Sequence, residues 1–146
     1  MDLNNGATTL NLGTNSLHWM TAYMPPPSFI QSRAGTTAYT QLVATQPTDA
    51  LGNVGTLSSA SLSANFDTQT VTAGVGVSVA SKVVNASGSF AISGSGFGGN
   101  FSTVTTGYSG NMQGAFAGEK ATGVGFGYSL WPTIASGPYT DLIQGV

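Results

Sequence analysis

The stretch GAFAGEKATGVGFGYSLW, residues 114–131, decides the fold of this 146-residue chain. Glu119 and Lys120 stand side by side in its middle, although charged residues make up only 5% of the sequence. After them, residues alternate strictly between glycine or serine and larger apolar types, which are Val124, Phe126, Tyr128 and Leu130. Alternation of this kind is the period of a β-strand. The stretch therefore predicts two strands joined by a tight turn that carries the charged pair.

The glycines of the returning strand leave one of its faces without side chains, at Gly123, Gly125 and Gly127. Repeated glycine weakens a strand, and it is typical of places where a sheet coils sharply or where another segment comes close. Two interpretations stay open. The glycines allow the curvature of a small closed barrel, or they make room for the N-terminal segment to lie against the strand.

The same alternation extends through the middle of the chain. Residues 59–66 and 71–79 each place alanine, leucine, phenylalanine or valine on one face and small polar residues on the other. The sequence FDTQTV between them predicts a turn, with Asp67 placed to bond the following backbone. Residues 86–93 predict a third strand, and a fourth is expected near residues 99–110.

The first third of the chain is less regular. Three prolines at positions 25–27 exclude a central strand there, whereas residues 36–44 predict a strand followed by a turn-rich loop. We therefore expect one all-β domain, a small antiparallel β-barrel of about eight strands with Gly-rich hairpins, with a sandwich as the other all-β possibility. Residues 35–146 form the barrel, and residues 1–34 form an irregular segment with a first strand and the Pro-rich loop, packed on it.

Composition excludes several classes of partner. The formal net charge is −2, and the three basic residues, Arg33, Lys82 and Lys120, lie far apart in the sequence, so nucleic-acid binding is not expected. The chain has no cysteine, hence no disulfide and no cysteine metal ligand. No apolar run is long enough for a transmembrane helix. No signal peptide is visible, so an exported protein would have to contain this chain as part of a longer one.

Catalytic groups are scarce. His18 is the only histidine, so an imidazole metal cluster is excluded, and we expect it to be packed or at an interface. Asp49 and Asp67 occur in turn sequences, where a carboxylate normally bonds nearby backbone. The sequence GSGFGG at 94–99 matches a dinucleotide-binding pattern, but a polar, strand-like sequence follows it, so we interpret it as a Gly-rich loop or a kink in a strand. We expect no cofactor, no metal and no enzymatic activity.

Aromatic residues and prolines gather between Trp19 and Phe29. One interpretation is a lid that closes one end of the barrel; the other is a contact surface for a partner, since aromatic residues are enriched in binding interfaces. Trp131 follows the last clear strand and is a candidate for the same surface. The candidate partner-contact residues are Trp19, Tyr23, Phe29 and Trp131.

Several phrases resemble a known family. They are GTTAYTQLVATQPTDALGNVGTL, SASLSANFDTQTV, GNMQGAFAGEKATGVGFGYSL and DLIQGV, and they contain the pattern G-x-F-x-G at Gly114–Gly118, followed by a charged pair and a strand ending in tyrosine. Over roughly residues 35–146 the chain resembles the small β-barrel domain of transferrin-binding protein B-like proteins, which also occurs at the C-terminus of Gram-negative FecR-domain proteins. The resemblance implies an antiparallel barrel of about eight strands. It also implies either binding at the cell surface or a role as an exported module in iron-linked systems.

We therefore expect one of two functions. The first is a non-enzymatic binding module that contacts a protein or a small ligand through its loops, exported to the periplasm, outer membrane or cell surface of a Gram-negative bacterium. The second is a structural subunit of a surface layer or filament, possible as a homo-oligomer because a chain with so little charge has little repulsion to prevent edge pairing.

Overall fold

The computed structural model describes residues 17–41, 43–134 and 142–146. This part of the chain contains one short helix and ten strands. In chain order the elements are α1 (Pro27–Ser32), β1 (Thr36–Tyr39), β2 (Thr48–Asp49), β3 (Thr56–Asn65), β4 (Thr70–Val79), β5 (Lys82–Ser93), β6 (Gly96–Asn100), β7 (Thr103–Val104), β8 (Tyr108–Ala117), β9 (Gly123–Pro132) and β10 (Ile143–Gly145).

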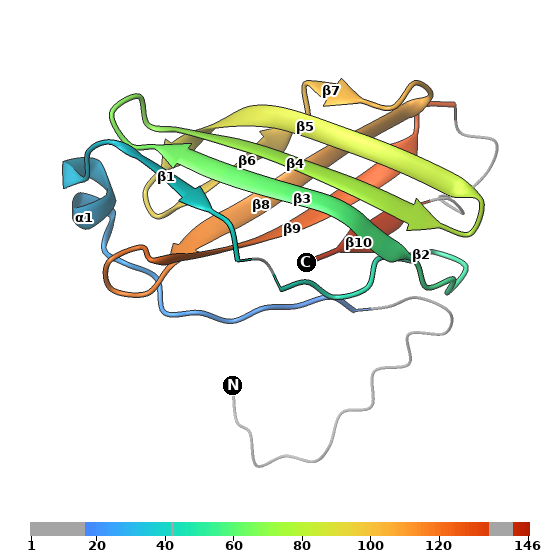
Figure 1. The fold of residues 1–146 in the computed structure, drawn as a ribbon, viewed down its shortest axis with the longest axis horizontal. Coiled ribbons are helices and arrows are strands. Elements are labelled where there is room, and N and C mark those ends of the chain that lie inside the picture. Colours follow the sequence, from blue (N-terminus) through green and yellow to red (C-terminus); the bar gives the residue numbers. More distant parts are fainter. Residues whose placement is uncertain (1–16, 42, 135–141) are drawn as a thin grey trace, which may run out of the picture.

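The strands form one antiparallel sheet in the order β1-β3-β4-β5-β6-β8-β9-β10-β2, with β7 pairing β5 at the side. Figure 1 shows how this sheet curls, so that β3, β4 and β5 lie across β8, β9 and β10 as a half-barrel. The prediction of an all-β antiparallel fold is confirmed. The edge strands β1 and β2 do not pair with each other within the described residues, so the sheet itself is not a closed ring.

The interior follows the predicted alternation. On β4, every second residue from Val71 to Val79 is buried, and register places Val75 opposite Ala60 of β3 and Ala86 of β5. The hairpin of β3 and β4 is confirmed, as is the inward face of β5, where Phe90 is buried. The apolar side chains of these strands face those of β8 and β9 across the interior, which explains why the two layers stay together.

The hairpin of β8 and β9 has its exposed tip at Glu119 and Lys120, as predicted. The sequence left two roles open for the glycines of β9, which were curvature of the sheet and room for the N-terminal segment. A side chain added at Gly125 would overlap the sulfur of Met20, so at least this glycine makes room for the N-terminal segment. In Figure 1 that segment runs along one side of the half-barrel from α1.

Two predicted strands are wrong in extent. The strand expected over residues 36–44 ends at Tyr39, because the chain then leaves β3 and crosses to the opposite edge, where the Thr45 N–H donates to the Val146 carbonyl at 2.8 Å. The strand expected near residues 99–110 is interrupted. Its sequence supplies the end of β6, all of β7 and the beginning of β8.

The turn between β3 and β4 is present, but its hydrogen bonds differ from the expectation. The side-chain oxygen of Asn65 accepts from the N–H groups of Asp67 and Thr68. The Asp67 carboxylate instead accepts from the Gly35 N–H at 3.0 Å and thereby fixes the entry to β1. A side-chain bond to the turn backbone was predicted correctly, but it was assigned to Asp67 and is made by Asn65.

One end of the half-barrel is closed by α1. Ile30 of this helix is fully buried in the core, and Phe29 packs against it. Pro25 is also buried, and its carbonyl accepts a hydrogen bond from Ser95. A lid is therefore present at this end, but it is formed by Pro25, Phe29 and Ile30. Trp19 and Tyr23 of the expected aromatic cluster are exposed instead. Residues 17–34 contain no strand, and residues 1–16, where the expected first strand would otherwise lie, are outside the described residues.

An apolar lumen as the candidate functional site

The interior of the half-barrel is unevenly filled. Near α1, the rings of Phe66 and Phe97 pack on Phe116 with centroid separations of 5.3 and 5.5 Å. Farther along the same strands the inward residues of β3 and β4 are short, at Ala60 and Val75. These short side chains and Phe126 of β9, on the other side, do not fill the space between the layers.

That space is a cavity of about 290 Å³, here called the lumen cavity. Apolar side chains supply most of its wall. They come from β3 and β4 on one side and from β9 on the other, with the N-terminal segment, the stretch after β1 and the C-terminus at its border; they include Leu57, Ala60, Val75, Val124, Phe126, Tyr128, Trp19, Met20, Val43 and Val146. Among the described residues that line it there is no Asp, Glu, Lys or Arg.

The N-terminal segment, residues 17–24, forms one border of the lumen cavity. Its Met20 packs on Gly125, and the carbonyl of Tyr23 accepts a hydrogen bond from the Gly118 N–H at 2.8 Å. Trp19 also lines the cavity, yet its side chain is 70% exposed. The segment is thus held at a few points and leaves large apolar groups at the entrance.

His18 holds the beginning of this segment. Its two ring nitrogens lie 2.8 Å from the Thr45 hydroxyl and 2.7 Å from the Thr48 hydroxyl. Partial burial lowers the pKa of His18 below its ordinary 6.5, because the charged ring is less well solvated there. The expectation of a packed histidine is confirmed, and the imidazole is neutral at physiological pH.

Gln41, Thr45 and Tyr128 are the residues with polar side chains that line the lumen cavity. Tyr128 differs from the other two, which are exposed. Its side chain is buried, with 5% exposed, and its hydroxyl has no hydrogen-bond partner in the described part of the chain. The hydroxyl lies against Gly145 of the neighbouring strand, where an added side chain would overlap it. Burial raises the pKa of Tyr128 to about 12, so the group is a protonated donor across the physiological range. Sequence alternation placed Tyr128 inward but gave no sign that its hydroxyl is unpaired.

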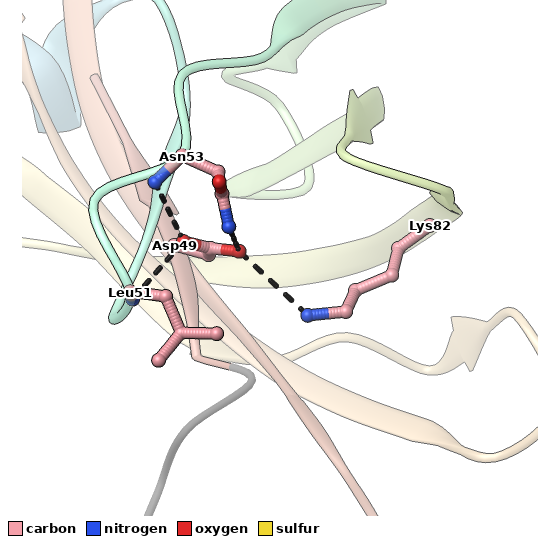
Figure 2. Close-up of polar contacts among 4 residues, drawn as sticks. All are labelled: Asp49, Leu51, Asn53 and Lys82. Carbon is pink, nitrogen blue, oxygen red and sulfur yellow. Dashed lines mark hydrogen bonds and ion pairs between the residues drawn. The ribbon is translucent and has the colours of Figure 1, made fainter.

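Asp49 forms a separate polar cluster at the far end of the sheet (Figure 2). Its carboxylate accepts from the backbone N–H groups of Leu51 and Asn53 at 3.0 and 2.9 Å, and from the Asn53 side chain at 2.8 Å. Lys82 lies 3.7 Å away. Burial acts to raise the pKa of Asp49, but these hydrogen bonds and the charge of Lys82 outweigh it and lower the pKa. The predicted turn role is confirmed, and the cluster also ties β2 to the beginning of β5.

The four predicted contact residues do not form one patch. Trp19 borders the lumen cavity, Tyr23 is 66% exposed near the turn between β8 and β9, and Phe29 packs on the core from α1. Trp131 lies at the other end of β9, about 30 Å of strand away from that turn. It borders a different hollow of about 370 Å³, lined largely by polar residues.

Groups for other chemistries are not assembled in the described residues. They contain no cluster of three or more His, Asp or Glu that could hold a metal ion, and no helix there is long and apolar enough to cross a membrane. The GSGFGG sequence forms a turn and the beginning of β6, without the helix that a dinucleotide site needs. A loop or a kink in a strand was expected for that sequence, and it has a turn at Gly94 and Ser95 followed by a strand.

A scan against protein-family models finds no match for this chain, and a search of curated proteins finds none either.

Proposed function

We propose that this chain is a non-enzymatic binding module that takes a small apolar molecule into the lumen cavity. The observation that carries the proposal is the cavity itself: about 290 Å³, lined mainly by apolar side chains, within an otherwise well-packed interior. This volume equals about ten water molecules and lies at the lower end of known ligand sites. Water gains few hydrogen bonds in such a space, so an apolar molecule is favoured over it.

The sequence resemblance supports the same class of function. The transferrin-binding protein B-like barrel is a binding domain of exported proteins, and we extend its location, the periplasm or cell surface of a Gram-negative bacterium, to this chain as part of the proposal. A closed barrel belongs to the proposal too. Residues 17–24 and the stretch after β1 would complete the wall where β1 and β2 do not pair.

Naphthalene is a suitable probe because it is apolar and small enough for the cavity. Equilibrium dialysis is expected to show saturable binding to the full chain, with one site. Ala60→Phe fills the lumen cavity and should weaken that binding about tenfold or more. Ser61→Leu, on the exposed outer face of the same strand, is the matched control and should bind as the wild type does. Absence of saturable binding, or equal binding by both variants, would overturn the proposal.

Self-assembly is the second candidate, and a specific observation favours it. β1 covers only residues 62–65 of β3, so Thr56–Ser61 has a strand partner on one side alone among the described pairings. No charged residue occurs in β3 or β4 to discourage edge pairing. Light scattering over a concentration series tests this candidate. Growth into oligomers that Ser59→Lys prevents would support assembly, whereas a monomer at every concentration would exclude it.

A further inference from the structure

We infer that the outer face of β6, β8, β9 and β10 binds a neutral oligosaccharide, one ring of which stacks on Trp131 while its hydroxyls contact a row of polar side chains. This site is separate from the lumen cavity, and the inference goes beyond the proposed function. The polar row consists of register partners on four neighbouring strands, which are Asn100, Asn111, Ser129 and Gln144.

The polar row lies on the outside of the half-barrel. Directly opposite residues of an antiparallel pair share a face, and Met112, the next residue after Asn111, is fully buried in the core. Asn100 and Asn111 are exposed, whereas Ser129 is half-buried and accepts a hydrogen bond from Gln144 at 3.3 Å. Three strand spacings of about 4.8 Å give the row a length of about 14 Å, which suits about three sugar rings.

Trp131 lies on the same outer face, two residues beyond Ser129 and opposite Ser109. Two residues of strand cover about 7 Å, so the indole lies about one sugar ring away from the polar row. Trp131 is half-buried, and it is the one large apolar side chain that faces outward from β8 and β9, which are described along their whole length. A pyranose ring has C–H groups on its faces, and these pack well on the negative face of an aromatic ring.

Two adjacent hollows give the ligand room. One, of about 310 Å³, is lined by Asn111, Ser129 and Gln144, and the other, of about 370 Å³, by Asn100 and Trp131. They adjoin because Asn100 and Asn111 are register partners. Within the part of the chain that the structure describes, the side chains of Asn100, Asn111 and Trp131 have no hydrogen-bond partner. Their polar groups are therefore available to a ligand.

The chemistry of this face selects a neutral and hydroxyl-rich ligand. The strands β6, β8, β9 and β10 contain no charged residue, so an acidic glycan would find no Lys or Arg there to pair with. Amide side chains both donate and accept hydrogen bonds, as sugar hydroxyls do. A protein partner is disfavoured, because protein interfaces have an apolar and aromatic core, whereas this face carries mainly glycine, serine and amides.

Four tetrasaccharides test the inference on the full chain by isothermal titration calorimetry. Cellotetraose, maltotetraose and N-acetylated chitotetraose are neutral, and tetragalacturonate is anionic. We expect at least one neutral tetrasaccharide to bind saturably, with a Kd of about 1 mM or lower, and tetragalacturonate to bind at least about tenfold more weakly. Trp131→Ala should weaken the binding about tenfold or more, and Asn111→Ala about three- to tenfold.

Matched controls come from other parts of the surface. Asn85→Ala removes an exposed amide from β5, in the opposite layer, and Tyr23→Ala removes an exposed aromatic side chain near the turn between β8 and β9. Both should bind as the wild type does. Trp131→Tyr keeps an aromatic face and should retain most of the affinity, which separates the loss of stacking from a loss of folding.

Tryptophan fluorescence locates the ligand without removing Trp131. The chain has two tryptophans, so Trp19→Phe leaves the emission of Trp131 alone, which should shift to shorter wavelength and saturate with the neutral tetrasaccharide. In Trp131→Phe the emission of Trp19 should not respond. The inference would be overturned by absence of saturable binding of all three neutral probes, by tetragalacturonate binding as tightly, or by unchanged affinity in Trp131→Ala and Asn111→Ala. Naphthalene binding is a separate result that bears on the proposed function alone.

Discussion

His18 links the N-terminal segment to the rest of the sheet through two threonine hydroxyls. Because the pKa of His18 is lowered in the folded protein, the stability it contributes is fully present above its ordinary value of 6.5 and is lost as the pH falls through the lower, folded value. Protonation puts a poorly solvated charge at the attachment. The segment that borders the lumen cavity should therefore loosen in mild acid.

Hydrogen exchange at the Gly118 amide measures this loosening, since that N–H donates to the Tyr23 carbonyl. We expect its protection factor to fall between about pH 7 and about pH 5 in the wild type. In His18→Gln, which cannot titrate, protection should be lower at neutral pH and should change little over the same range. A wild-type protection factor that stays constant with pH would contradict this account of His18.

Asp49 is expected to matter for stability and not for ligand binding. Asp49→Ala leaves Lys82 without its carboxylate and removes the acceptor of two backbone N–H groups, so the free energy of unfolding should fall by about 2–4 kcal/mol. Denaturant unfolding gives the value. Asp67→Ala, at an exposed site with one hydrogen bond to Gly35, is the control and should cost about 1 kcal/mol or less.

Much of the residue-level pattern follows from the sequence. Alternation correctly placed Tyr128 inward and Glu119 at a hairpin tip, because both depend only on neighbours in the chain. The partners of His18 and Lys82 could not be predicted. Thr45 lies 27 residues from His18, and Asp49 lies 33 residues before Lys82, so these contacts exist only once the sheet has brought distant segments together.

The helix α1 is an element that the sequence did not predict. Strands of ten residues with strict alternation were predicted correctly, whereas the six-residue α1 is too short to show a helical period. Pro27 at its first turn favours a helix start, but three adjacent prolines are equally typical of a loop. β1 was predicted too long because the sequence after Tyr39 keeps strand-like composition while the chain turns toward Val146.

The lid formed by α1 gives a prediction about stability. Ile30 is fully buried, so Ile30→Ala should reduce the free energy of unfolding by about 2–4 kcal/mol. Chemical denaturation followed by circular dichroism measures the change. Gln31→Ala alters the next, exposed residue of the same helix and is expected to be close to neutral. Equal stability of the two variants would mean that α1 does not close the core.

At the scale of the whole molecule, the half-barrel explains why a lumen exists. The interior is packed around Phe116 near α1, but the short Ala60 and Val75 leave a gap where they lie across from Phe126. The N-terminal segment covers the side that strand pairing leaves open. The sequence predicted the all-β class through local alternation. It did not reveal the cavity, because its volume depends on how the two layers face each other.

Methyl NMR during a naphthalene titration tests the central claim most directly, because it reports where the probe binds as well as whether it does. The account predicts that the methyl groups of Leu57, Val75 and Val124 shift together and saturate, while those of the buried Val79 and the exposed Val83 do not move. Shifts confined to exposed residues, or no saturable shift at Val75 and Val124, would contradict a ligand-binding lumen.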